Sequence, residues 1–277
     1  MYIFEGEIRT ISPLHIASGD GNIRYDFATG RRLYGGKGGA GHPLACTQAI
    51  EVALPNEEGH TARIPIIHAN TLRGRIRRQA ASIVADALAE KGEKIEFDTL
   101  LRMLSGTSSG RPNKTPIPVD MMQEIIAHPF AGLFGGGERM LPSRLVVHAA
   151  IGAFEEAAEI GMIQHATMQI APHQAFAVIP IRRIHDLMHD PVRIQNDYER
   201  VVREFLDRAT EILQEEAERQ RARKNGGESA SRMIESMNAL EFVIPGVRFH
   251  WRVETSGDSH HAGLLLMSLE KLAHAQV

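Results

Sequence analysis

Apolar and polar residues alternate in several short segments of the chain, which predicts β-strands there. Residues 2–10 alternate loosely in this way. Residues 145–149 and 242–254 show a similar pattern and are also expected to be strands. A weaker alternation at 160–184 ends in an apolar run and predicts a hairpin or a pair of strands.

Other apolar residues recur every three or four positions, as they do on one face of a helix. The clearest such segment runs from about residue 71 to residue 90 and follows Asn70, a residue type typical of helix N-caps. A second long amphipathic helix is predicted over 197–224, ended by Gly226-Gly227. A shorter amphipathic helix is predicted over 262–275.

Glycine and proline mark the irregular parts of the chain. Residues 17–45 contain eight glycines, which predicts a long loop whose backbone turns tightly or approaches another molecule. Residues 95–128, which are rich in Gly, Ser and Pro at 105–118, are predicted to form an irregular insert. The order of elements predicts a mixed α+β fold in one domain, 1–277, similar to a split βαβ arrangement with insertions.

The composition is that of a soluble globular protein. Of the 277 residues, 43% are hydrophobic and 23% are charged, which excludes disordered and collagen-like classes. No apolar run approaches the roughly 18 residues of a membrane span, and the first ten residues lack the layout of a secretory signal. We therefore expect a cytoplasmic protein without a membrane partner. The single cysteine, Cys46, allows neither an internal disulfide nor a zinc–cysteine cluster.

The formal net charge of −3 argues against a nucleic-acid partner, which usually leaves a basic footprint. The charge is uneven, however. Residues 1–150 carry 17 basic and 15 acidic side chains (+2), and residues 151–277 carry 14 and 19 (−5). A nucleic acid would therefore have to bind one basic patch. Because aromatic residues make up only 5% of the chain, we expect contacts with phosphates, glycine backbone and aliphatic side chains rather than broad stacking platforms.

The segment 70–78, NTLRGRIRR, places four arginines at the start of the first long helix. At about 100° per residue, Arg75 and Arg78 point away from the apolar stripe, while Arg73 and Arg77 lie at its edge. A helix N-terminus has free N–H groups and a partial positive charge, both suited to phosphate, and the glycine of the segment lets a backbone approach closely. A phosphate site is one interpretation of this segment, and a solvated helix face is the other.

Three further motifs do not support a cofactor. Lys37 lacks the spacing of a phosphate-binding P-loop. Glycines 135–137 lack the strand-to-helix context of a dinucleotide fingerprint, so no nucleotide cofactor is predicted. His185 and His189 are spaced as in zinc metalloproteases, but an Asp replaces the usual Glu and Pro191 follows at once, so a solvated turn is favoured.

Four segments, in their order along the chain, resemble the RAMP superfamily of CRISPR-associated proteins. They are SPLHIASG at 12–19, IIHANTLRGRIRR at 66–78, AGLFGGG at 131–137 followed by LVVH at 145–148, and PGVRF at 245–249. The layout is most similar to the backbone subunit, the Cas-seven type, in its type IV version.

The resemblance implies a ferredoxin-like (RRM-like) palm with an inserted thumb hairpin at 160–184 and a helical region at 190–238. It also implies a subunit that is not an enzyme and polymerises along a guide RNA. Its partners would be further copies of itself, other CRISPR effector subunits and, through the guide, target nucleic acid. The residues expected to bind RNA are His15, Lys37, Asn70, Thr71, Arg73, Gly74, Arg75, Arg77, Arg78, Gly135, Gly136, Gly137, Arg139, Met168, Arg182 and Arg183.

Two alternatives from other functional classes remain open on the residues alone. One is a metal-independent endoribonuclease of the same superfamily, which would process precursor RNA with a histidine such as His15 or His68. Some relatives cleave target RNA with an Asp in the loop after the first strand. This chain has Asp20 and Asp26 in that region, and neither is aligned to the catalytic position. The other alternative is a zinc hydrolase that uses the histidine pair at 185 and 189.

Overall fold

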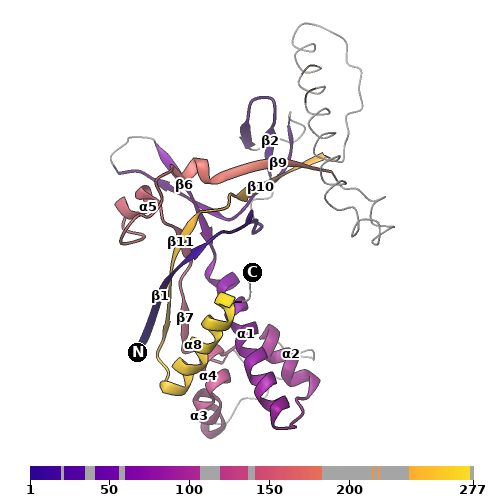
Figure 1. Cartoon of the computed structure of the whole chain (residues 1–277), viewed down its shortest axis with the longest axis vertical. Coiled ribbons are helices and arrows are strands. Elements are labelled where there is room, and N and C mark those ends of the chain that lie inside the picture. The colour runs from indigo at the N-terminus through magenta and orange to yellow at the C-terminus, as the bar shows by residue number, and fades with distance from the viewer. Residues whose placement is uncertain are drawn as a thin grey trace. The chain divides into compact units, whose positions relative to one another are not determined.

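The computed structural model describes residues 1–19, 22–34, 41–55, 60–106, 119–136, 141–182 and 237–274, together with positions 214 and 218. The chain divides into two compact units. Unit 1 consists of 1–9, 50–172 and 247–277, and unit 2 consists of 10–49 and 173–246. Each of the two units is built around a sheet (Figure 1). The single RAMP-like domain over 1–277 stays a prediction.

The sheet of unit 1 has the strand order β1-β11-β8-β6-β5, and β7 also pairs with β11. Its strands are β1 (Tyr2–Arg9), β5 (Ala49–Ala53), β6 (Thr61–Ile67), β7 (Leu145–Val147), β8 (Ala150–Gly152) and β11 (Arg248–Thr255). β1 and β11 pair antiparallel without a break, from Tyr2 opposite Thr255 to Arg9 opposite Arg248. β1 lies at one edge of the sheet. The strands predicted near residues 2 and 145 are confirmed.

The two faces of this sheet differ in polarity because successive side chains of a strand point to opposite sides. Phe249 and Val253 of β11 are fully buried on the face that packs against helices. On the opposite face, Arg252 of β11 donates hydrogen bonds to Glu5 of β1 at 3.1 Å and to Glu254 at 2.8 Å. These paired charges occupy the face on which a stacking platform would need aromatic side chains.

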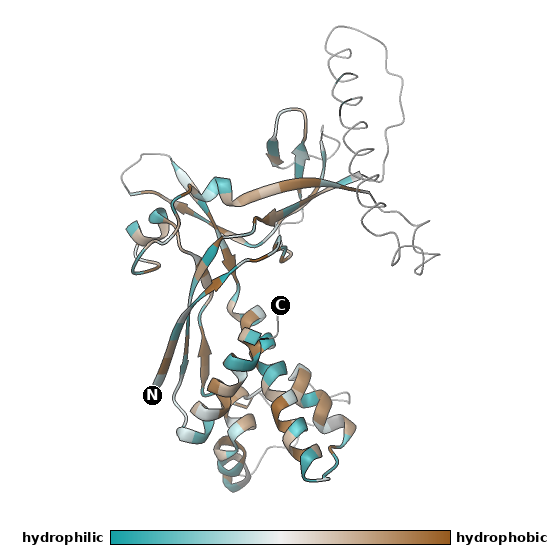
Figure 2. Ribbon diagram, viewed as in Figure 1, coloured by the Kyte–Doolittle hydropathy of each residue, from teal (hydrophilic) through white to brown (hydrophobic). Residues whose placement is uncertain are grey.

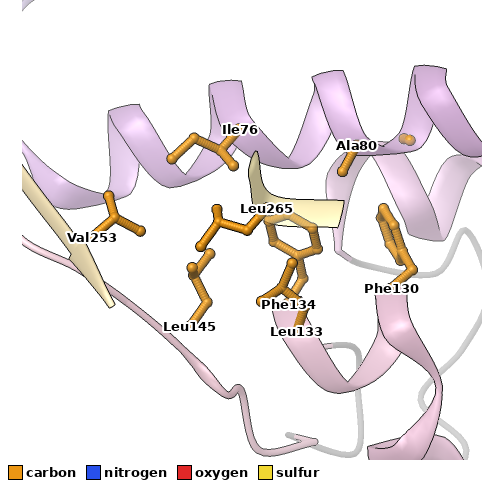
Figure 3. Packing of buried hydrophobic residues seen from close by; sticks show 9 residues of the cluster. Ile76, Ala80, Phe130, Leu133, Phe134, Leu145, Val253 and Leu265 are labelled. Atoms are coloured by element: carbon orange, nitrogen blue, oxygen red, sulfur yellow. The ribbon is translucent and has the colours of Figure 1, made fainter. Parts of the chain in front are cut away.

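The helices of unit 1 supply most of its core. They are α1 (Ala69–Glu90), α2 (Phe97–Ser105), α3 (Val119–Ala127), α4 (Pro129–Phe134), α5 (Glu155–Glu159) and α8 (Ser259–His274). Figure 2 shows hydrophobic and hydrophilic residues on the same helices, as amphipathic packing requires. In Figure 3, Leu133 and Phe134 of α4 lie with Leu265 of α8 beneath Ile76 of α1, and all four are buried.

Helix α1 begins two residues earlier than predicted. Its N-cap is His68, with φ −58° and ψ 143°, whereas Asn70 lies in the first turn. The N–H groups of Thr71 and Leu72 donate to the His68 carbonyl oxygen at 2.9 and 3.2 Å. No side chain caps this end. Strand β6 ends at the buried Ile67 and leads directly into the helix. The position of the helix start is therefore set by the buried strand before it, and not by a capping side chain.

The segment 95–128 contains two helices, which corrects the prediction of an irregular insert. α2 and α3 lie toward its two ends, and residues 107–118 between them lie outside the described residues. The Gly-, Ser- and Pro-rich composition is confined to the middle of the segment, while α2 presents apolar residues such as Met103 to the core of unit 1. Gly106 ends α2 in the left-handed conformation, with φ +77°.

Unit 2 contains a five-stranded sheet in the order β3-β2-β4-β10-β9. Its strands are β2 (Ile23–Asp26), β3 (Arg31–Tyr34), β4 (His42–Ala45), β9 (Phe176–Arg182) and β10 (Met237–Val243). β10 runs parallel to β4 and antiparallel to β9. The buried Glu241 of β10 forms an ion pair with Arg32 of β3 and accepts a hydrogen bond from the Thr47 N–H at 3.0 Å. This carboxylate therefore joins three separate segments of unit 2.

The thumb hairpin predicted at 160–184 does not form from that segment alone. Its one strand, β9, pairs with β10, with Arg182 opposite Met237. A 3-10 turn at Pro172–Ala175 precedes β9. The weak alternation before that turn belongs to an irregular stretch, in which the Met168 N–H donates to the Ala153 carbonyl oxygen at 2.9 Å. The two strands of the ribbon thus come from distant parts of the chain.

The predicted helical region at 190–238 lies almost entirely outside the described residues, of which it includes only 214, 218 and the start of β10. The last predicted helix is confirmed as α8. Within the described ranges, no helix combines the length and the apolar character that crossing a bilayer requires.

Asp258 lies immediately before α8 and caps it. Its Oδ1 atom accepts hydrogen bonds from the N–H groups of His260 at 2.9 Å and His261 at 3.2 Å. The same oxygen lies 2.8 Å from Nδ1 of the buried His261 ring. The hydrogen bonds from His261 lower the pKa of Asp258 to about 2. Because the pKa is lowered in the folded state, the carboxylate stabilises the fold above the ordinary pKa of an Asp, and this contribution is lost as the pH falls toward 2.

We therefore expect Asp258→Asn to lower the unfolding temperature at neutral pH, because Asn keeps a capping oxygen but loses the charge that faces His261. The difference from the wild type should shrink between roughly pH 4 and pH 2. Thermal unfolding followed by circular dichroism measures it. Glu270→Gln, at an exposed position of α8, is the control. A difference that is constant with pH would contradict this account of the cap.

Candidate nucleic-acid interface

The four arginines at the start of α1 separate into two pairs. Arg75 and Arg78 are exposed, whereas Arg73 and Arg77 are partly buried. Within the described part of the chain, Arg75 and Arg78 make no hydrogen bond or ion pair, so their guanidinium groups are available to a ligand. The helical spacing predicts this division, because residues three apart share one side of a helix.

Arg77 uses each of its three nitrogen atoms on a backbone carbonyl. Its Nε donates to the Met103 oxygen at 2.8 Å and its Nη2 to the Arg102 oxygen at 3.1 Å, both in the last turn of α2. Its Nη1 donates to the oxygen of Gly135, the residue that ends α4, at 3.3 Å. The C-termini of two helices, which carry partial negative charge, therefore meet at one guanidinium group.

Aromatic rings and a glycine enclose the rest of the Arg77 guanidinium. Its Cζ lies 5.7 Å from the ring centroids of both Phe130 and Phe134, within cation–π range. A Cβ atom on Gly106 would lie 2.9 Å from Arg77 Nη1. Burial, and then the charge of Arg73, lower the pKa of Arg77. A guanidinium group remains charged at neutral pH even so.

The glycine turn after α4 is held next to the start of α1. Arg73 Nη2 donates to the Phe134 carbonyl oxygen at 2.6 Å. Gly135 and Gly136 have φ angles of +54° and +90°, a region that favours glycine. Gly136 also exchanges two backbone hydrogen bonds with Leu141, of 3.0 and 3.3 Å. The structure thus brings together the two motifs, the helix start and the glycine turn, that the sequence singled out separately.

Gly74 differs from these glycines because nothing in the described structure requires it. It lies inside α1, and a Cβ atom there would meet only Nη2 of Arg78, at 4.0 Å. Glycine in a helix interior costs roughly 0.5–1 kcal/mol relative to alanine. An approach of another molecule to the backbone between Thr71 and Arg78 would explain the residue, since both flank it on the same side of the helix.

The other predicted RNA-binding residues belong to other parts of the chain or lie outside the described residues. His15 is in unit 2, where its Nδ1 lies 2.6 Å from the Glu241 carbonyl oxygen and burial lowers its pKa. Met168 is partly buried in unit 1, and Arg182 is the last residue of β9. Residues outside the described ranges are Lys37, Gly137, Arg139 and Arg183.

The residues of the alternative activities have ordinary structural surroundings where they are described. Asp26 accepts hydrogen bonds from the Ala28 N–H at 2.9 Å and the Thr29 hydroxyl at 2.8 Å, which is the pattern of a turn residue. Asp20 and the histidines at 185 and 189 lie outside the described residues. Within the residues that were described, no group of three or more His, Cys, Asp or Glu side chains is placed to hold a metal ion.

The sequence did not predict the contact between α1 and the end of α2. Arg77 donates to the carbonyl oxygens of Arg102 and Met103, and a backbone carbonyl cannot be recognised from the residue type because every residue has one. Gly106 was the available signal, because a glycine directly after an amphipathic run is typical of a helix C-terminus.

No family model and no curated protein sequence matches the chain. A solved structure does. The chain is similar to one from a structure titled "Type IV-B CRISPR Complex", with a TM-score of 0.54 and 13% sequence identity over 99% of this chain and 82% of that one. The shared fold is the predicted ferredoxin-like α+β fold. In unit 1, β1, α1, β7 with β8, β11 and α8 occur in this sequence order and correspond to the first five elements of the βαββαβ order of that fold.

Gly74→Ala tests whether the glycine of α1 is structural. We expect the variant to be more stable than the wild type by about 0.5–1 kcal/mol, because the helix gains propensity and the new Cβ meets no clash. Urea unfolding followed by circular dichroism measures the change. Gly132→Ala is the matched opposite, since a Cβ there would lie 2.0 Å from the Ile126 oxygen, and it should destabilise. A loss of stability in Gly74→Ala would show that the fold itself needs this glycine.

Proposed function

We propose that this protein is a non-catalytic RNA-binding subunit of a CRISPR effector complex, and that several copies form a backbone along one guide RNA. The observation that carries the proposal is the fold similarity over 99% of the chain to a chain of a type IV-B CRISPR complex. The arginine-rich start of α1 supports it, because it offers free guanidinium groups on the outside of that fold.

The chemistry of the exposed pair suits a phosphate backbone. Arginine presents a planar fork of N–H donors that matches two phosphate oxygens. Gly74, between the two arginines and Thr71, gives the RNA backbone room to approach the helix. Contacts of this kind position a nucleic acid without reading its sequence, which is what a subunit that holds many different guides requires.

The partners follow from the same proposal. Neighbouring copies and other effector subunits would contact the protein, and target nucleic acid would reach it only by pairing with the guide. The location would be the cytoplasm.

The subunit would hold RNA without cleaving it, so an RNA incubated with the protein should keep its length. Shortened products would favour the endoribonuclease alternative.

We expect Arg75→Ala combined with Arg78→Ala to weaken RNA binding and to reduce its salt dependence. Each phosphate contact contributes about 0.7 to the slope of log K against log salt for single-stranded nucleic acid, so the slope should fall by about 1.4. Fluorescence anisotropy with a labelled single-stranded RNA, over a series of salt concentrations, measures it.

The matched control removes the same charge elsewhere in unit 1. Lys91→Ala combined with Lys94→Ala changes two exposed residues beyond the end of α1. This variant should keep the slope of the wild type. Equal slopes for both double variants would mean that the arginine pair is not the RNA-binding surface.

A further inference from the structure

Given the proposed function, we propose that Arg77 is a positioning residue: it holds the glycine turn and the end of α2 against α1, and it does not contact RNA phosphate itself. The resemblance had placed Arg77 among the RNA-binding residues. The contacts of its guanidinium group give it a different role.

The first argument is the number of donors. A guanidinium group has five N–H bonds, and in Arg77 each of the three nitrogens already donates to a carbonyl oxygen. Two N–H bonds, one on each Nη atom, are left, so a phosphate that bound through more than these two would displace carbonyl oxygens. The Arg102 carbonyl would still accept from the Gly106 N–H at 2.9 Å, but the part-buried carbonyls of Met103 and Gly135 would lose hydrogen bonds from a charged group, which is costly.

The second argument is space. Phe130 and Phe134 lie within 5.7 Å of the Arg77 Cζ, and the position of a Cβ on Gly106 is 2.9 Å from Nη1 and 3.1 Å from Cζ. Gly136 is close as well, with its Cβ position 3.5 Å from Nη1. The group is therefore enclosed by the chain on several sides. Arg75 and Arg78, in contrast, are exposed.

The third argument is what the contacts connect. Arg77 lies in α1, its partners at 102–103 end α2, and Gly135 ends α4. These three parts of unit 1 are far apart in the sequence. Removing Arg77 would loosen the glycine turn beside α1, although Arg73 would still donate to the Phe134 carbonyl. RNA that contacts both the helix start and the turn would then bind less tightly, by the same factor at every salt concentration.

Two substitutions distinguish positioning from phosphate binding. Arg77→Lys keeps the charge but cannot reach three carbonyls at once, because lysine has a single ammonium group. We expect Arg77→Lys and Arg77→Ala each to lower the unfolding temperature by roughly 4–10 °C, since hydrogen bonds from a charged group are lost. In both variants the line of log K against log salt should shift to weaker binding and stay parallel to the wild type.

Gly106→Ala perturbs the same contact without changing any charge. Its new Cβ would press on Arg77 Nη1, and its φ is +77°. Gly92→Ala is the control, because Gly92 has a φ of +72° and nothing within 4 Å of its Cβ position. Gly106→Ala should shift the line of log K against log salt to weaker binding, as Arg77→Lys does, and by more than Gly92→Ala. If Arg77→Ala does not fold, the comparison of the two glycine variants still tests whether Arg77 is a positioning residue.

Other outcomes would overturn the inference. A slope lower by about 0.7 in Arg77→Ala would mean that Arg77 contacts a phosphate. An unchanged unfolding temperature would mean that it does not hold the helix ends. A binding line that coincides with the wild type would mean that it does not position the RNA-binding surface. A wild-type protein that fails to bind RNA at all would contradict the proposed function, and the unfolding temperatures would still test the helix contacts.

Discussion

The organisation of unit 1 around α1 depends on where the Arg77 guanidinium lies. Helix ends leave carbonyl oxygens without partners, and α2 and α4 end at the same place. One cation donates to carbonyl oxygens at both ends, and its Cζ lies within cation–π range of the rings of Phe130 and Phe134. Because so many contacts meet at one side chain, the helix start and the glycine turn are held together as one surface.

Some of this could be predicted from the sequence. The strand near residue 2 and the first long helix have local sequence patterns, and both elements formed, although the helix begins at Ala69 and not after Asn70. The hairpin at 160–184 could not be predicted correctly, because β9 takes its partner from residues 237–243. The role of Arg77 was also hidden. Its polarity suggested a ligand from outside, whereas its partners are backbone oxygens, which every residue type carries.

The distribution of charge also shows that only part of the basic segment is exposed to a ligand. A net charge of −3 is unfavourable for indiscriminate binding to nucleic acid. Two of the four arginines in the basic segment are exposed, and Arg77 compensates helix dipoles inside the unit. The number of basic residues in a motif therefore overestimates the charge that a ligand would meet. Burial, which the composition does not report, decides how many of these charges are available.

The edges of the two sheets are not equivalent. Among the described strands, β3 and β5 are short edges, and β9 carries Pro180, which has no N–H to offer a neighbouring strand. β1 is eight residues long, has no proline and pairs with β11 without a bulge. Among the described strands, its outer side is thus the one long, regular row of backbone groups of the kind with which a strand of another polypeptide can pair.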